Sequence, residues 1–214
     1  MTVNELKKAN VSVNTIELNN LKSKDVTHLL QDTLKNHSKQ IQSLTDLIYN
    51  KTQGNPFFTR QFIKTLYDDN LITFDFDTHK WIWDLEKIQS KNITDNVVEL
   101  MTNKIDKLPQ ATSDILQLAS CIGNKFNLSI LSIIYEQNKE STLSILWKAI
   151  EEGLILPFED KYKQHEINEK SYFRFLHDRV QQAAYSLINE SSKKQTHLKI
   201  GRLLLTNISK EELN

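Results

Sequence analysis

The sequence predicts a mainly α-helical fold with small β-hairpins. Three observations support this fold class. Apolar residues recur at helical spacing along most of the 214 residues. The chain holds only four glycines and three prolines, which suits helices joined by short loops. Two stretches, residues 71–85 and 154–177, break the helical pattern, and each is expected to contain a pair of short strands.

The first elements are a short strand and two helices. Residues 11–18 alternate well enough to predict a strand. A helix is expected over 23–35, with Ser23 as its N-cap, because its leucines and valine share one face. A second helix is expected over 39–54. It should end at Gly54, since a glycine backbone suits a helix stop.

A third helix and a hairpin follow. Asn55 and Pro56 predict a helix start, with the asparagine as N-cap and the proline in the first turn. The segment LITFDFDTHKWIWDL predicts a hairpin that turns at residues 77–80, with Phe76 on one arm. The tryptophans of the other arm are predicted to form a packing face, because strand alternation alone accounts for them.

The remainder predicts a winged helix followed by further helices. Thr94 is expected to cap a helix that stops before Pro109. A set of three helices, two strands and a long polar loop between the strands is the layout of a winged helix, with the loop as the wing. Asp178 is expected to cap the next helix. The predicted ranges are 110–121, 128–136 and 141–152 for the helices, 154–158 and 172–177 for the strands, and 190–208 for a final helix.

Charge and cysteine content exclude several classes of function. Lysine plus arginine and aspartate plus glutamate number 27 each, so the formal net charge is +0. This balance argues against broad binding to nucleic acid or to anionic membrane. No segment reaches the length of a membrane span, and the first residues lack a signal peptide. The single Cys121 allows no internal disulfide, reads as a core residue, and favours a cytoplasmic location.

Catalytic and metal-binding patterns are missing. The sequence contains neither GxxxxGK[ST] nor GxGxxG, the glycine-rich loops that hold phosphate groups. Its six histidines are scattered, and none has metal-ligand spacing to another histidine or to the cysteine. The third helix of the winged helix offers Lys148 against Glu151 and Glu152, which is a poor DNA-reading surface. We therefore expect no catalytic residue and no metal site, and the sequence disfavours DNA binding.

Two local features remain as candidate binding sites. Gly54-Asn55-Pro56 opens a helix, and Leu176-His177-Asp178 lies where a strand gives way to a helix. Backbone rules explain each of them on its own: a helix stop, a cap and a first-turn proline in the first, and a cap in the second. A histidine beside a helix N-terminus can also meet an anion, so a binding role stays open.

Read together and in order, these pieces resemble the STAND class of signal-transduction ATPases, which are related to the AAA+ proteins. The resemblance is greatest to the ATPase region of large multidomain bacterial sensor kinases, in which a serine/threonine-kinase-like domain precedes the ATPase and histidine-kinase modules follow it. It is densest in KTQGNPFFTRQFIKTLYDDNLITFDF, ITDNVVELMTNKIDKLP, LWKAIEEGLILP and FLHDRVQQAAYSLI. The resemblance implies an AAA+ helical lid followed by a winged-helix domain.

The resemblance also implies roles for three residues. The family has a Gly-x-Pro motif in its lid, matched here by Gly54 and Pro56, and the proline would pack against the adenine base. A Met-His-Asp motif in related winged helices places its histidine near the β-phosphate of ADP. Here Leu176 replaces the methionine and His177 retains the histidine. His177 would then hold a closed, ADP-bound state.

The implied domains are the last strand of a missing ATPase core (1–20), the lid (21–90), the winged helix (91–189) and the start of a helical region (190–214). The P-loop and the acidic magnesium-binding strand of the family are absent from this sequence. Phosphoryl transfer needs both, so we expect no catalysis by this chain alone. ATP or ADP is expected as cofactor only if the missing P-loop domain is supplied. The expected partners are the ATPase core and kinase modules of a parent protein.

Two alternatives remain open at this point. The same fold could serve as a protein-interaction module that uses no nucleotide, through its exposed strand and apolar lid helices. The chain could also be a nonfunctional truncated remnant of a larger protein. A DNA-binding winged helix is the third and weakest alternative, because the charge balance disfavours it.

Overall fold

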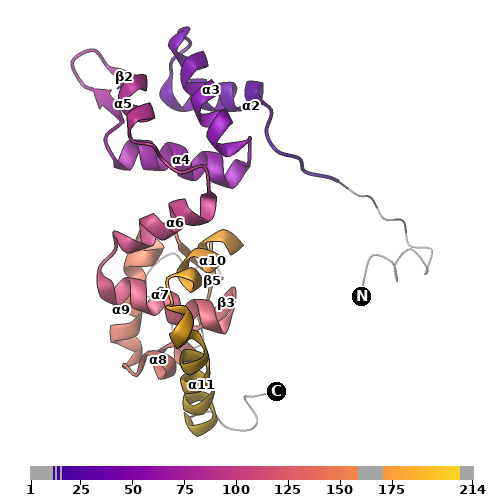
Figure 1. Cartoon of the computed structure of the whole chain (residues 1–214), viewed down its shortest axis with the longest axis vertical. Helices are drawn as coiled ribbons and strands as arrows, with labels where there is room; N and C mark the ends of the chain where they lie inside the picture. The colour runs from indigo at the N-terminus through magenta and orange to yellow at the C-terminus, as the bar shows by residue number, and fades with distance from the viewer. Residues whose placement is uncertain (1–11, 13, 15, 159–170, 208–214) are drawn as a thin grey trace. The chain divides into compact units, whose positions relative to one another are not determined.

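A computed structural model describes residues 12, 14, 16–158 and 171–207 (Figure 1). These residues form two compact units, and the division falls between Ile93 and Thr94. Most of the described residues are helical, and the strands are short and antiparallel. This agrees with the predicted class, mainly helical with small β-hairpins. In the part of the chain that the structure describes, no helix is both long and apolar enough to cross a membrane.

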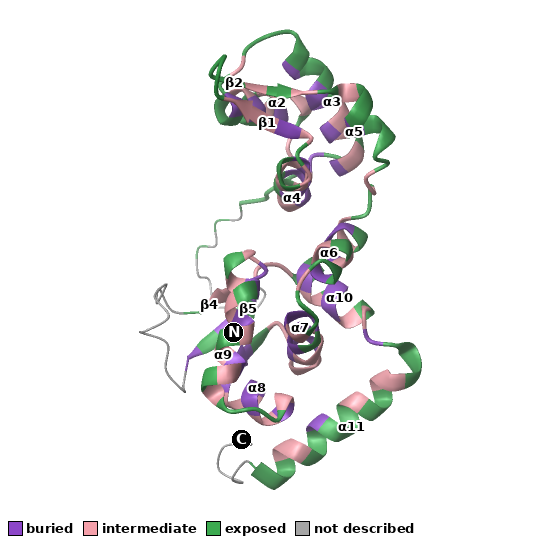
Figure 2. Ribbon diagram, turned by 90° about the vertical axis from the view of Figure 1, so that its left-hand side faces the viewer, coloured by how far each residue is buried: buried purple, intermediate pink, exposed green. Residues whose placement is uncertain are grey.

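The first unit is built from three helices, a hairpin and a short fourth helix. The helix α2 packs on α3, α3 packs on α4, and α4 also packs against β1. Figure 2 shows their buried faces turned toward one another. The elements are α2 (Ser23–Leu34), α3 (Gln40–Thr52), α4 (Pro56–Asp68), β1 (Ile72–Asp75), β2 (Lys80–Trp83) and α5 (Leu85–Ser90). The fully buried core residues include Val26, Leu30, Leu44, Ile48, Phe62 and Leu66.

The hairpin has the predicted strand pairing but a shifted turn. Phe74 lies opposite Trp81 and Ile72 opposite Trp83, so these four apolar side chains share one face. The turn occupies residues 76–79 instead of 77–80. The prediction that Phe76 belongs to the strand was therefore wrong. Asp75 closes the turn by accepting hydrogen bonds from the Thr78 hydroxyl and the Asp77 amide, and this fixes the end of β1.

The second unit combines helices with a three-stranded antiparallel sheet of order β3-β5-β4. Phe126, Phe173, Phe175 and Ile155 point to one face of this sheet and are almost fully buried. The elements are α6 (Val97–Asp106), α7 (Gln110–Ile122), β3 (Lys125–Asn127), α8 (Leu128–Tyr135), α9 (Lys139–Glu151), β4 (Ile155–Pro157), β5 (Tyr172–Phe175), α10 (Asp178–Ser186) and α11 (Glu190–Asn207). The predicted order of three helices and two strands is present, with β3 inserted between the first two helices.

Three predicted helix caps were wrong by one or two residues. Lys22 rather than Ser23 precedes α2, and the Lys22 amide donates to the Asp25 carboxylate. Asn96 rather than Thr94 caps α6, where its side chain accepts from two backbone amides. Thr94 instead accepts a hydrogen bond from the Asn96 amide. The cap of α10 was also misassigned, and it bears directly on the candidate site.

The predicted strand over 11–18 is not found among the residues that can be described there. Residues 12, 14 and 16–18 have no regular secondary structure, and the rest of that range lies outside the described residues. The exposed Ile16 and Leu18 side chains meet no neighbouring strand, and a strand needs a partner for its backbone hydrogen bonds. The predicted wing also lies outside the described residues, except for Ser171.

Candidate functional site

Gly54 lies where the chain reverses between α3 and α4. Gln53 and Gly54 both have left-handed backbones, with φ of 51° and 69°. The Leu21 amide donates to the Gly54 carbonyl over 2.8 Å. A Cβ on Gly54 would lie 2.0 Å from the Leu21 carbonyl oxygen, so no side chain fits without moving the backbone. The close approach of residue 21 is therefore sufficient to explain this glycine.

Pro56 is the first residue of α4, as predicted. The Asn55 side chain caps this helix and accepts a hydrogen bond from the Phe58 amide over 2.9 Å. The α3 and α4 ends are joined by a buried hydrogen bond between the hydroxyls of Thr52 and Thr59, 3.0 Å apart. Pro56 itself is exposed. The arrangement holds a rigid, apolar ring at the surface of the first unit, beside a capped helix start.

His177 is the N-cap of α10, which corrects the prediction that Asp178 caps this helix. Its Nδ1 accepts a hydrogen bond from the Arg179 amide over 3.2 Å. Asp178 is the first helical residue, and its carboxylate accepts from the Asn124 side chain over 2.7 Å. Histidine is not among the usual cap residues, so propensity pointed to the aspartate. A neutral imidazole has a lone pair that can also accept a hydrogen bond from a backbone amide, and the sequence prediction did not consider this.

Backbone hydrogen bonds to two different segments fix the two residues that precede His177. The Phe175 amide donates to the Asn124 carbonyl over 3.0 Å, and the Leu176 amide donates to the Leu154 carbonyl over 2.9 Å. Because Nδ1 accepts, a neutral His177 carries its proton on Nε2, an assignment that follows from the hydrogen-bond geometry. The ring is thus held in one orientation, half-buried at the start of a helix.

The predicted site residues belong to different units. Gly54 and Pro56 lie in the first unit and His177 lies in the second. Within the first unit, Gly54 and Pro56 are adjacent parts of one turn between helices. Within the second unit, His177 is positioned by β5, α10 and the segments before β3 and β4.

Nucleophilic and metal chemistry find little support in the described residues. Cys121 is half-buried at the end of α7, and burial raises the pKa of its thiol, so the thiolate is disfavoured at neutral pH. Within residues 16–158 and 171–207, no three histidine, cysteine, aspartate or glutamate side chains gather in a way that could hold a metal ion.

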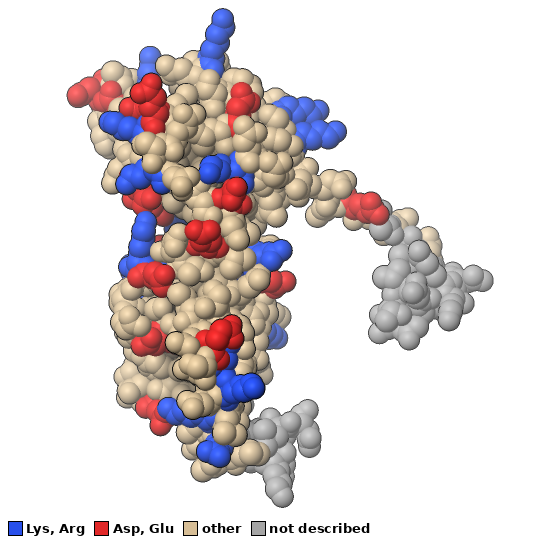
Figure 3. All heavy atoms as spheres, in the orientation of Figure 1, with Lys and Arg blue, Asp and Glu red and all other residues tan. Residues whose placement is uncertain are grey.

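Neither sign of charge dominates the face of the molecule that Figure 3 presents. Figure 3 shows basic and acidic side chains interspersed over the face that it presents. On α9, Lys148 forms ion pairs with Glu151 at 3.4 Å and with Glu152 at 3.9 Å. The lysine that was considered for DNA contact is therefore paired within its own helix, which leaves little positive charge there for phosphate groups.

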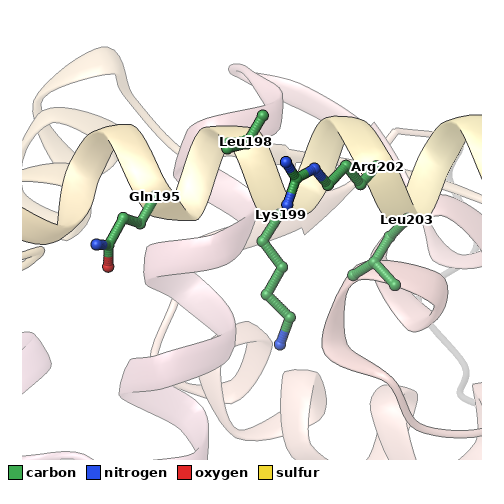
Figure 4. Close-up of a pocket in the computed structure, with 5 residues that line it drawn as sticks. All are labelled: Gln195, Leu198, Lys199, Arg202 and Leu203. Carbon is green, nitrogen blue, oxygen red and sulfur yellow. The ribbon is translucent and has the colours of Figure 1, made fainter.

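A hollow on α11 is separate from the predicted site residues. It is lined by Gln195, Leu198, Lys199, Arg202 and Leu203, all from this one helix (Figure 4). Lys199 forms an ion pair with Glu136 at the end of α8. The hollow thus combines apolar side chains with two basic ones, the ion-paired Lys199 and Arg202. None of the sequence motifs discussed above includes these residues.

Two signalling proteins are similar to this chain over most of its length. A Dictyostelium discoideum protein called hybrid signal transduction histidine kinase G is 36% identical over 217 residues, which span 88% of this chain and 6% of that protein. The peroxide stress-activated histidine kinase mak3 of Schizosaccharomyces pombe is 25% identical over 158 residues, 72% of this chain and 7% of the kinase. The chain thus spans only a small part of each relative.

No family model matches the chain. A solved structure of an organohalide-sensing transcriptional regulator, in its 2,4-dichlorophenol-bound form, is 19% identical and covers 61% of this chain and 73% of its own, with a TM-score of 0.29. A likeness at that TM-score does not establish a shared fold. The similarity to the two histidine kinases supports a sensor-kinase context for this chain.

Proposed function

We propose that this chain is a regulatory segment of a multidomain sensor histidine kinase. The observation that carries the proposal is the 36% identity with histidine kinase G across 88% of this chain. Because the matched stretch is only 6% of that protein, the segment would work together with many other domains. The two relatives come from an amoeba and a yeast, so the kinase context extends beyond the bacterial proteins that the sequence resembles.

The finer proposal is that the segment is the lid and winged helix of a STAND-type ATPase. Three features support it. The second unit combines α7, α8 and α9 with an antiparallel sheet of order β3-β5-β4, an arrangement that a winged helix also has. The Gly54–Pro56 turn opens a capped helix in the first unit. The His177 ring is held at a helix N-terminus, where backbone amides favour an anion.

In this proposal, nucleotide binding requires a phosphate-binding module from the same or another chain. The residues present here fit a part in that binding. Pro56 offers an exposed apolar ring on which a base could pack. The His177 ring, held beside the first amides of α10 by the bond from the Arg179 amide to Nδ1, would lie next to a phosphate oxygen. Loss of that contact would release the winged helix for a rigid-body swing that passes the signal onward.

The structure shows how to test His177 without a stability artefact. His177→Ala would remove both the imidazole and the helix cap, whereas His177→Asn removes the imidazole and keeps a good cap. ADP would be titrated calorimetrically into a longer chain that includes the P-loop module. We expect His177→Asn to weaken ADP binding roughly tenfold or more, as the loss of one hydrogen bond to a charged group does.

His28→Ala is a suitable control, because His28 is exposed on α2 and far from either motif in the sequence. Its ADP affinity should equal that of the unmodified chain. If His177→Asn also leaves the ADP affinity unchanged, the proposed role of His177 is wrong. If the longer chain binds no ADP at all, the nucleotide-independent interaction module becomes the better proposal.

A further inference from the structure

Four aromatic side chains of the first unit form a continuous row, here called the aromatic ladder: Tyr67, Trp81, Phe74 and Phe76. Tyr67 comes from α4, and the others come from the hairpin. Neighbouring rings meet edge to face, with centroids 5.9 Å, 5.4 Å and 5.2 Å apart along the row. These separations and angles are those of favourable aromatic pairs, so the ladder is a rigid apolar surface.

The two ends of the ladder are open to solvent. Phe76 is 80% exposed and Tyr67 is 56% exposed. Phe76 lies in the hairpin turn, where asparagine, aspartate or glycine is the usual residue. The turn does not need an aromatic ring at this position. Large exposed aromatic side chains gathered on one surface are typical of protein-binding sites.

The ladder lies in an acidic part of an otherwise neutral chain. Between residues 67 and 84 the sequence has five aspartates and one lysine, a local charge of about −4, whereas the whole chain has equal numbers of acidic and basic residues. Asp75 is occupied in the turn, and Asp84 caps α5 and forms an ion pair with Lys87 at 3.8 Å, so these two carboxylates have partners within the unit. Asp68 and Asp77 are exposed beside the two ends of the ladder, next in sequence to Tyr67 and Phe76.

We propose that the aromatic ladder is a docking surface for a basic segment of a partner protein. Arginine and lysine stack their charged groups on aromatic faces and can reach carboxylates at the rim of the same surface. Nucleic acid and anionic lipid do not fit, because their phosphates would face the aspartates. This surface involves neither Pro56 nor His177, so it goes beyond the nucleotide-linked function and stands or falls separately from it.

The hairpin provides its own reporter for the test. Two of the three tryptophans, Trp81 and Trp83, lie in β2, and Trp147 lies in α9. In a Trp147→Phe background, tryptophan fluorescence therefore reports only on the hairpin. The probe is a synthetic peptide of alternating arginine and leucine, compared with a peptide of alternating glutamate and leucine. We expect saturable binding of the basic peptide, which weakens with added salt, and no binding of the acidic peptide.

Two variants test the surface and one serves as a matched control. Phe76→Ala, and separately the double change Asp68→Asn with Asp77→Asn, should each weaken binding of the basic peptide roughly fivefold or more. Ile82→Ala is the control, because Ile82 belongs to the same hairpin, is 51% exposed, and points to the opposite face. It should bind like the unmodified chain. All these side chains are exposed, so thermal unfolding should confirm that every variant folds.

Several outcomes would overturn the proposal. Equal weakening by Ile82→Ala and Phe76→Ala would show that the aromatic ladder is not the surface used. Equal affinity for the acidic and basic peptides would remove the role of the aspartates. Binding to phosphatidylserine vesicles in place of the basic peptide would identify a lipid surface, which contradicts a basic protein partner.

Discussion

Gly54 offers a quantitative test of why a glycine stands at the turn between α3 and α4. Its φ of 69° costs an alanine about 1–2 kcal/mol. Its added Cβ would also lie 2.0 Å from the Leu21 carbonyl oxygen, so residue 21 must move and its hydrogen bond to Gly54 is lost. That bond contributes about 0.5–1.5 kcal/mol. We therefore expect Gly54→Ala to lower the free energy of unfolding of the first unit by about 2–3 kcal/mol.

Two other glycines separate these contributions. Gly153 has nearly the same φ, 67°, but no atom within 4 Å of the position of an added Cβ. Gly153→Ala should therefore cost only the conformational part, about 1–2 kcal/mol. Gly201 lies within α11 with open space around it. Because alanine is the better helix former, Gly201→Ala should stabilise the second unit by about 0.5–1 kcal/mol.

Urea unfolding followed by tryptophan fluorescence gives the assay. Trp81 and Trp83 report on the first unit and Trp147 on the second, so single-tryptophan backgrounds resolve the two transitions. For Gly54→Ala the midpoint should fall by about 1 M urea or more, from typical slopes for small domains. If Gly54→Ala costs no more than Gly153→Ala, the close approach of Leu21 does not explain the glycine.

Two further predictions concern titrating groups. The Thr78 hydroxyl and the Asp77 amide hold the pKa of Asp75 below its ordinary value, so Thr78→Val should raise that pKa, as measured by carboxyl-carbon NMR. The stabilisation from Asp75 is present above its unfolded-state pKa and is lost as pH falls through the lower folded-state pKa. The unmodified chain and the Thr78→Val variant should therefore become equally stable in acid. An unchanged Asp75 pKa in the variant would contradict this account. Burial raises the pKa of the Cys121 thiol, so a disulfide reagent at pH about 8 should modify it more slowly than a free thiol, and urea should abolish the difference.

The long amphipathic elements could be predicted from the sequence, and the short ones could not. Helices such as α3 and α4 place several buried residues on one face over three turns, and this pattern is visible in any window of that length. The helix α5 has six residues and buries only Ile88, so it has no measurable period. The strand β3 has three residues, and it exists because Lys125–Asn127 pairs with β5, nearly fifty positions later in the chain. No local signal contains that pairing.

The candidate site was predictable in its residue types but not in its contacts. Asn55 and Pro56 follow strong backbone rules, and their positions at the start of α4 confirmed the predicted cap. Two adjacent polar residues could cap α10. In the structure the Asp178 carboxylate accepts from the Asn124 side chain, and His177 is the cap. Asn124 lies 54 positions away from Asp178 in the chain, so cap propensity alone pointed to Asp178 and missed His177.

The sheet order β3-β5-β4 has a consequence for how the chain folds as it is synthesised. The first unit uses neighbours in sequence, with α2 packing on α3, α3 on α4, and β1 on β2, so it can form as soon as its last residues emerge. The second unit cannot close early, because β5 joins both other strands and α10 packs on α6, which was made some eighty residues before. Until then, Phe126 and its neighbours stay uncovered. We therefore expect a ribosome-bound intermediate with one folded unit and one that is open to chaperones.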